Sequence, residues 1–229
     1  MPAMIFDVDG TLVDSNDAHA RSWVETLQEA GLPSDFGTVR RLIGVGGDKL
    51  LPQVTGVAPE SERGKRILER RTEIFRDRYM SGLRPFPGAR QLLQALASDG
   101  FRLAVATSAR KDELARLLEI AGVSDLVEKK TSASDVESSK PDPDVVHAAL
   151  GRLGVEPGQA FLVGDTPYDG EAAHRSGVRF IGFRCGGAPK ACSGVDAGHL
   201  VGGQWAIEHH SRIGRRRLDH RQIRLLSEN

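Results

Sequence analysis

The chain has 229 residues, with 31 Lys and Arg residues balanced by 31 Asp and Glu residues, and 39% of it is hydrophobic. This length fits one large domain, or one domain with a small insertion, and the composition is that of a folded globular protein. The charge balance gives no electrostatic case for nucleic-acid binding, and two cysteines are too few for a disulfide framework or a four-ligand zinc site. Without a signal peptide or a long apolar run, the sequence favours a cytoplasmic protein with no membrane association.

An acidic loop follows the first apolar run of the chain. Ile5 and Phe6 lead into Asp7, Asp9 and Gly10, so the pattern predicts a buried strand that ends in a turn. Both carboxylates would then lie beyond the carboxyl edge of a sheet, where open α/β sheets bind ligands. A loop or helix-capping pair of aspartates is the ordinary alternative. A calcium loop is excluded because its glycine stands sixth, and Gly10 is fourth.

Positions 15–84 show helical patterns and no strand. Apolar residues recur at helical spacing over 17–30, more weakly over 39–51, and again over 61–79. A glycine cluster at 44–47 lacks the spacing of a phosphate-binding loop and is expected to be a turn between helices. Basic residues flank the cluster and could meet an anionic substrate, although solvated surface charge is the simpler interpretation; they are Arg40, Arg41 and Lys49.

Strands and helices alternate after the proline-rich joint at 85–88. The expected helices span 89–98, 111–121, 143–153 and 171–176, and the expected strands span 101–106, 126–128, 160–163 and 180–183. Such alternation predicts an α/β fold with a doubly wound parallel sheet.

Three further polar sites follow the acidic loop. Thr107 ends the strand at 101–106, Lys140 precedes two prolines, and Asp165 and Asp169 stand four apart after the strand at 160–163. Taken singly, each would be a turn residue, a surface charge or a helix cap. In this order, however, the motifs Asp-x-Asp-x-Thr, Thr, Lys and Gly-Asp-x-x-x-Asp resemble the haloacid dehalogenase-like (HAD) hydrolase superfamily. From Met4 to about Cys185 the chain is most similar to the phosphoglycolate phosphatase-like branch.

This resemblance implies a Rossmann-like core, formed by 1–14 and 85–186, with a type 1 α-helical cap domain inserted at 15–84. It implies Mg²⁺-dependent hydrolysis of a small phosphate monoester, of the phosphoglycolate or sugar phosphate type, through an aspartyl-phosphate. The partner would be a small phosphorylated metabolite. The sequence leaves a monomer or a dimer open.

The resemblance also assigns roles to the motif residues. Asp7 would be the nucleophile, and Asp9 would protonate the leaving group and then activate water. The Mg²⁺ ligands would be the side chains of Asp7 and Asp165 and the backbone carbonyl of Asp9, with Asp169 in the same shell or just outside it. Lys140 would pair with Asp7 and with the phosphate. The Thr107 hydroxyl and the backbone amides of Gly10 and Ser108 would also bind the phosphate.

Three other functions compete with a phosphatase. A phosphosugar mutase shares all four motifs, and cap residues decide between the two. A haloacid dehalogenase is disfavoured because it needs no acid/base at the position of Asp9. A non-enzymatic receiver module phosphorylated on aspartate also uses an acidic cluster, a threonine and a lysine, but the helical insertion and the early Asp7–Asp9 pair count against it.

The segment 187–229 departs from the resemblance. It is rich in glycine and histidine and then strongly basic, with six arginines after position 211. A nucleic-acid-binding arm is one interpretation, which the lack of aromatic residues after Trp205 weakens. A variable, partly disordered extension and a shifted reading frame are both favoured over it. We expect residues beyond about His209 to be dispensable for turnover.

Overall fold

A parallel sheet forms the centre of the molecule. The computed structural model describes residues 1–186 and 207–209. Its strands are arranged in the order β3-β2-β1-β4-β5-β6, with β1 to β5 parallel and β6 antiparallel to β5. This arrangement confirms the predicted α/β fold. The strands are β1 (Ala3–Phe6), β2 (Arg102–Ala106), β3 (Lys129–Thr131), β4 (Ala160–Gly164), β5 (Arg179–Phe183) and β6 (Ile207–His209).

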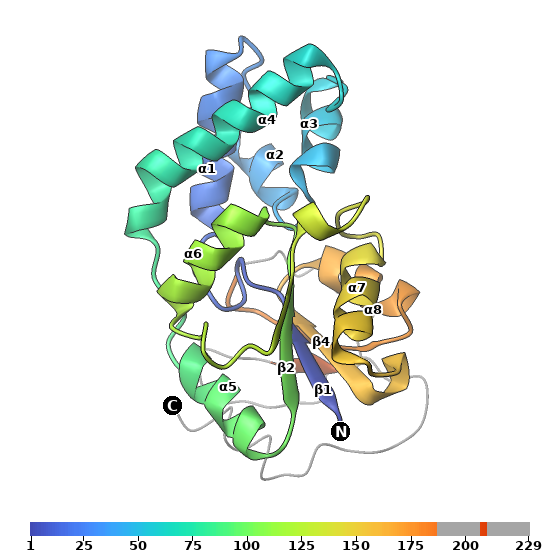
Figure 1. Cartoon of the computed structure of the whole chain (residues 1–229). Helices are drawn as coiled ribbons and strands as arrows, with labels where there is room; N and C mark the ends of the chain where they lie inside the picture. Colours follow the sequence, from blue (N-terminus) through green and yellow to red (C-terminus); the bar gives the residue numbers. More distant parts are fainter. Residues whose placement is uncertain (187–206, 210–229) are drawn as a thin grey trace.

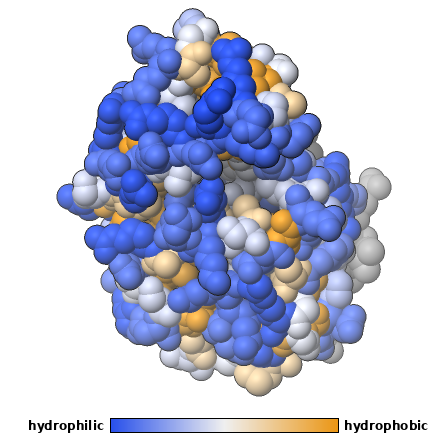
Figure 2. Space-filling view, turned by 45° about the horizontal axis from the view of Figure 1, so that its top comes forward, coloured by the Kyte–Doolittle hydropathy of each residue, from blue (hydrophilic) through white to orange (hydrophobic). Residues whose placement is uncertain are grey.

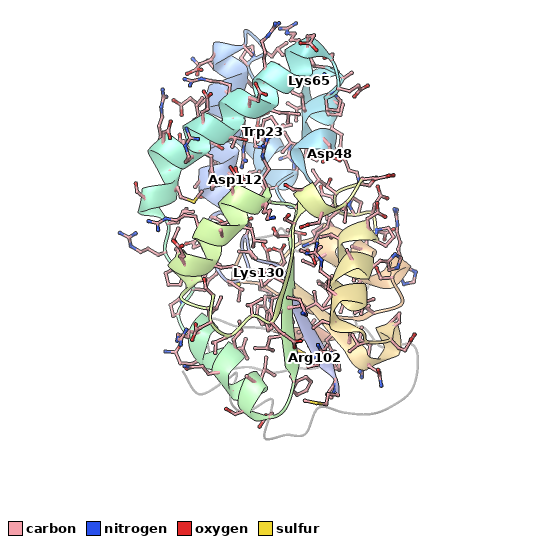
Figure 3. The ribbon with its side chains drawn as sticks, in the orientation of Figure 1. Trp23, Asp48, Lys65, Arg102, Asp112 and Lys130 are labelled. Atoms are coloured by element: carbon pink, nitrogen blue, oxygen red, sulfur yellow. The ribbon has the colours of Figure 1, made fainter. Side chains whose placement is uncertain are left out.

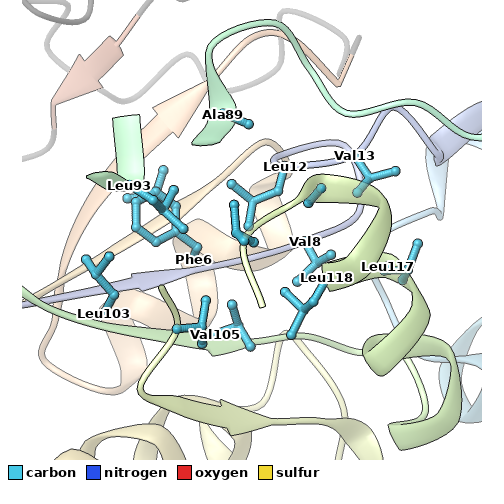
Figure 4. Close-up of a cluster of buried hydrophobic side chains, with 14 of the residues drawn as sticks. Phe6, Val8, Leu12, Val13, Ala89, Leu93, Leu103, Val105, Leu117 and Leu118 are labelled. Carbon is cyan, nitrogen blue, oxygen red and sulfur yellow. The ribbon is translucent and has the colours of Figure 1, made fainter. Parts of the chain in front are cut away.

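Helices cover both faces of the sheet (Figure 1). Side chains alternate along β1, so Met4 and Phe6 enter one apolar cluster while Ala3 and Ile5 enter a second. Figure 4 shows the first cluster, in which Phe6 lies close to Leu93 of α5. The helices that cover the sheet are α5 (Ala89–Ser98), α6 (Lys111–Ala121), α7 (Asp144–Leu153) and α8 (Pro167–Arg175).

A helical segment, residues 16–82, is inserted between β1 and β2 and lies beyond the carboxyl ends of the strands (Figure 1). It contains α1 (Asn16–Glu29), α2 (Phe36–Arg41), α3 (Gly47–Thr55) and α4 (Glu62–Ile74), followed by a π-helical turn (Phe75–Tyr79) and a 3₁₀ turn (Met80–Gly82). The segment has its own apolar cluster, which includes Trp23, Leu27, Leu51 and Ile67. Helices α1 to α4 therefore pack largely on one another.

The two connections between this helical segment and the sheet run side by side. The backbone N–H of Asp14 donates to the carbonyl of Arg84 (2.9 Å), and that of Phe86 donates to Leu12 (3.0 Å). The proline-rich joint therefore pairs with the chain that leaves the acidic loop.

Three predicted elements differ from the structure. The strand expected at 126–128 is wrong, because Val127 N–H bonds to the Val123 carbonyl in a turn and the strand begins at Lys129. The helix expected at 171–176 begins earlier, at Pro167, because Thr166 caps it and proline is tolerated at the first helical position. The helix expected over 61–79 changes to π-helix after residue 74.

The tail is described only in part. Strand β6 lies within the segment expected to be divergent, and its backbone pairs with β5. The expectation for residues beyond His209 lies outside the described residues. Within the described ranges, no helix has the length and apolar character needed to cross a bilayer. The face in Figure 2 is mostly hydrophilic, with small scattered apolar areas.

Candidate active site

Neighbouring strands bring the predicted polar residues to one edge of the sheet. Asp7 follows β1, Thr107 follows β2 and Asp165 follows β4, and these three strands are adjacent in the sheet. Because the strands are parallel, their carboxyl ends meet at the same edge. Lys140 reaches this edge from the irregular loop between β3 and α7.

Lys140 bridges two aspartates. Its Nζ atom lies 2.6 Å from Oδ1 of Asp7 and 2.7 Å from Oδ1 of Asp169, and only 1% of the residue is exposed. Such short charge-assisted hydrogen bonds in a buried place fix the positions of all three groups. The sequence predicted the contact with Asp7, and the contact with Asp169 is additional.

The first turn of α8 places Asp169. Its Oδ2 accepts hydrogen bonds from the backbone N–H and the hydroxyl of Thr166 (3.1 and 2.6 Å), and Thr166 in turn caps the helix. A Cβ atom on Gly164 would lie 2.4 Å from the Asp169 carboxyl carbon, so only glycine fits there. The second aspartate of the Gly-Asp-x-x-x-Asp motif thus packs against the glycine of the same motif.

Asp165 is the third carboxylate of the site. Its two oxygens accept hydrogen bonds from Nδ2 of Asn16 (2.8 Å) and from the hydroxyl of Thr11 (3.3 Å). Ligand oxygens of Asp7, Asp165 and Asp169 lie within 4.8 Å of one another, and all three residues are buried. This all-oxygen donor set is the kind that hard divalent cations prefer.

The charges of this trio are incompletely balanced. Three buried carboxylates face the single ammonium of Lys140. Burial raises the pKa of Asp7 well above its usual range, and although Lys140 lowers that pKa, Asp169 and Asp165 raise it further. Burial, aided by the charge of Asp169, raises the pKa of Asp165 to about 7. A divalent cation would supply the missing positive charge, so the residues present fit a metal.

Asp9 has partners of its own. Its Oδ1 accepts from the Ser15 hydroxyl (2.6 Å) and lies 2.7 Å from Nε2 of His19, whose ring stacks on Phe75 with 4.0 Å between centroids. Burial would raise the pKa of Asp9, but its contact with His19, helped by Ser15 and Arg71, lowers that pKa below its ordinary value. The side chain of Asp9 is therefore held by partners that differ from those of the trio.

The sequence did not predict the residues that support Asp9, which are His19, Arg71 and Glu113. Arg71 of α4 donates to Nδ1 of His19 and pairs with Glu113 of α6 (2.9 Å), of which only 3% is exposed. The available signal was a histidine ten residues after Asp9, near the start of the first helix. Nothing in the sequence pattern pointed to Arg71 or Glu113.

The residues expected to bind phosphate already form hydrogen bonds within the protein. The Thr107 oxygen accepts from the backbone N–H of Ala109 (3.0 Å), and the Ser108 hydroxyl donates to the Gly44 carbonyl (3.3 Å). The Gly10 N–H donates to the carbonyl of Val13 (2.8 Å), so this amide is already engaged. The structure thus brings Gly10 to the site without presenting its amide to a ligand.

The basic residues beside the glycine cluster form their hydrogen bonds and ion pairs with groups other than the carboxylate trio. Arg40 pairs with Asp17 (2.7 Å) and also donates to the Gly186 carbonyl, and Arg41 donates to the Thr38 hydroxyl on the same helix. Lys49 pairs with an aspartate two residues after Lys140. None of the three is therefore placed to replace Lys140.

Comparisons with known proteins agree with this geometry. The family model described as haloacid dehalogenase-like hydrolase matches residues 4–183. The phosphoglycolate phosphatase of Rhodospirillum rubrum is 35% identical over 187 residues, covering 78% of each chain. A hydrolase from Pseudomonas syringae superposes with a TM-score of 0.77 at 27% identity, covering 83% of this chain and 88% of that one.

A mutase has the same fold. The β-phosphoglucomutase of Clostridium difficile superposes with a TM-score of 0.72 at 19% identity, covering 80% of this chain and 84% of that one. At this identity the likeness concerns the fold alone.

Proposed function

The chain belongs to the haloacid dehalogenase-like hydrolase family, and we propose that it hydrolyses a small phosphate monoester with Asp7 as nucleophile. The observation that carries this proposal is the position of Lys140, 2.6 Å from Asp7 and 2.7 Å from Asp169. Relatives named phosphoglycolate phosphatase support the same reaction class. A phosphoglycolate-type or sugar phosphate ester is the substrate class that we propose.

In the first step an oxygen of Asp7 attacks phosphorus, and the bond from phosphorus to the ester oxygen breaks. Asp9, in its protonated form, gives a proton to the departing alkoxide, and an aspartyl-phosphate remains on Asp7. In the second step Asp9 takes a proton from water, whose oxygen attacks phosphorus. The bond between phosphorus and the Asp7 oxygen breaks, which frees the Asp7 carboxylate and releases inorganic phosphate. The hydrogen bonds from Ser15 and His19 suit Asp9 to this task because they hold its carboxyl group in one orientation.

Asp7, Asp165 and Asp169 would hold Mg²⁺, with the Asp9 carbonyl as a further candidate ligand. Bound there, the ion would neutralise the carboxylates and orient a phosphoryl oxygen. Lys140 would add a second positive charge beside the transferred phosphoryl group, and the Thr107 hydroxyl would donate to it. We propose Ser108 as a further phosphate donor through its backbone amide.

We infer that residues 15–84 form a cap domain over a core made of 1–14 and 85–186. The separate apolar cluster of the helical segment supports this division, as do the paired connections at Asp14 and Arg84. A cap would exclude water and contact the leaving group.

The test is turnover of a panel of phosphate monoesters, including phosphoglycolate and sugar phosphates, with and without Mg²⁺. The wild type should release inorganic phosphate only with the metal, and Asp7→Asn should release none. Isomerisation of a sugar phosphate without phosphate release would favour the mutase. Turnover by Asp7→Asn would contradict the nucleophile assignment.

A further inference from the structure

The residue before Lys140 is held by the helical segment. The Ser139 hydroxyl donates to Oδ1 of Asp48 (2.6 Å) and accepts from the backbone N–H of Gly46 (3.1 Å), while the Lys49 ammonium donates to the Ser139 carbonyl. Figure 3 shows Asp48 at the end of α3 that faces the sheet and its helices. These two partners of the Ser139 hydroxyl thus lie in the helical segment, 91 and 93 positions away in the sequence.

A second contact fastens the same loop on the other side of Lys140. Nζ of Lys49 lies 2.6 Å from Oδ2 of Asp142, and Arg175 of α8 lies 3.0 Å from the other oxygen of this carboxylate. The Asp142 backbone N–H also donates to the Ser139 carbonyl (3.1 Å). Lys49 therefore contacts both ends of the short turn that contains Lys140.

The close approach depends on a glycine. A Cβ atom on Gly46 would lie 2.4 Å from the Ser139 hydroxyl oxygen and 2.3 Å from the Asp48 carboxylate. Its φ of −71° is ordinary for any residue, so the requirement is one of space. The glycine cluster at 44–47 thus lets the helical segment reach the lysine loop.

These contacts are polar, whereas the helical segment packs internally on apolar side chains. Hydrogen bonds that exchange with water contribute little net free energy, so contacts of this kind can form and break while both parts stay folded. Losing them would release the loop on both sides of a buried lysine that must meet two carboxylates.

We propose that Asp48 and Lys49 are positioning residues, which hold Ser139 and Asp142 and so keep Lys140 between Asp7 and Asp169 while the helical segment is docked. The catalytic meaning of this arrangement rests on the proposed function, but the arrangement itself does not. The contacts of α3 thereby couple docking of the helical segment to completion of the site.

The test compares Asp48→Ala with Asp48→Asn in the full chain, and Lys65→Ala serves as an exposed control on α4. Asparagine keeps an oxygen that accepts from Ser139, whereas alanine keeps none. The first measurement is acetylation by acetic anhydride, followed by mass spectrometry, with the exposed Lys130 as internal reference. Lys140, of which only 1% is exposed in the docked arrangement, should be modified several-fold faster in Asp48→Ala, because a released loop exposes its amine to the reagent. It should react at the wild-type rate in the other two variants.

The second measurement is turnover. With Asp48→Ala, kcat should fall roughly 10-fold, the worth of a hydrogen bond to a charged group. The thermal midpoint should stay near that of the wild type, and Asp48→Asn should restore turnover. Unchanged labelling of Lys140 in Asp48→Ala would overturn the positioning role whether or not the protein is a phosphatase. Faster labelling of Lys140 in Asp48→Ala, together with a wild type that hydrolyses no ester, would instead reject the proposed function and keep the docking contact.

Discussion

The Nζ atom of Lys140 lies 2.6 Å from Oδ1 of Asp7, although 133 residues separate the two in the sequence. The pair joins the loop after β1 to the loop before α7, and a second contact to Asp169 joins it to α8. A buried lysine with two carboxylate partners links the segments that carry them, and it is also the local counterion of the site.

Lys140→Met should therefore destabilise the protein. Removing one partner of a buried ion pair leaves uncompensated charge and costs about 3–5 kcal/mol. We expect the free energy of unfolding, measured by denaturant titration without metal, to fall by this order. Lys130→Met is the control, because Lys130 is exposed on the edge strand β3, and this change should have little effect. Equal stability of the two variants would show that Lys140 is not the counterion of the site.

Asp7→Asn should have the opposite effect on stability. Burial raises the pKa of Asp7, so its charged form is costly in the folded protein. A neutral amide removes that cost, and without metal the variant should be at least as stable as the wild type while releasing no phosphate. Asp9→Asn should keep some turnover, slowed by about 10²–10⁴, the usual contribution of general acid–base help. A destabilised and inactive Asp7→Asn protein would suggest misfolding rather than a missing nucleophile.

The sequence predicted most of the parallel strands and the polar residues that follow them, because both depend on local patterns. Apolar runs that end in Asp7, Thr107 or Asp165 define strand ends, and parallel strands bring such ends together. The partners of Asp9 and of Ser139 were missed because they come from the helical segment. Contacts between separately packed parts leave no periodic signal in either part.

Stability without metal should fall as pH rises from about 4 to about 7. The pKa of Asp165 is raised to about 7, against an ordinary value near 3.9, so the folded state binds more protons than the unfolded state over this interval. Asp7, with its raised pKa, acts in the same direction. Carboxylates whose pKa is lowered, such as Asp135 at about 2, lose their contribution only below this interval.

Thermal midpoints between pH 4.5 and 8 would measure this effect. Asp165→Asn should flatten the dependence, and Mg²⁺ should raise the midpoint most at the upper end, where the carboxylates are ionised. The matched control is Asp17→Asn, an aspartate in the first turn of α1 that lies outside the trio and pairs with Arg40 at the surface. A midpoint that rises steadily with pH in metal-free protein would contradict the linkage.

The last prediction concerns His19 and Asp9, whose Nε2 and Oδ1 atoms are 2.7 Å apart. Leucine at position 19 keeps an apolar contact with Phe75 but removes the hydrogen-bonding nitrogen whose contact lowers the pKa of Asp9. That pKa should rise, so Asp9 should become an ionised base only at higher pH. The acid limb of the pH–kcat profile should move upward, and kcat at its maximum should fall because the carboxyl group is less firmly oriented.

A double-mutant cycle separates this role from general damage to the fold. If His19 acts through Asp9, then His19→Leu should slow the wild type clearly but change little in an Asp9→Asn background, because the group that it positions is already disabled. Arg71→Met should follow the same pattern more weakly, since Arg71 reaches Asp9 mainly through the ring of His19. Full additivity of the His19 and Asp9 substitutions would mean that His19 affects turnover by another route, and the assignment of His19 as the residue that orients Asp9 would fail.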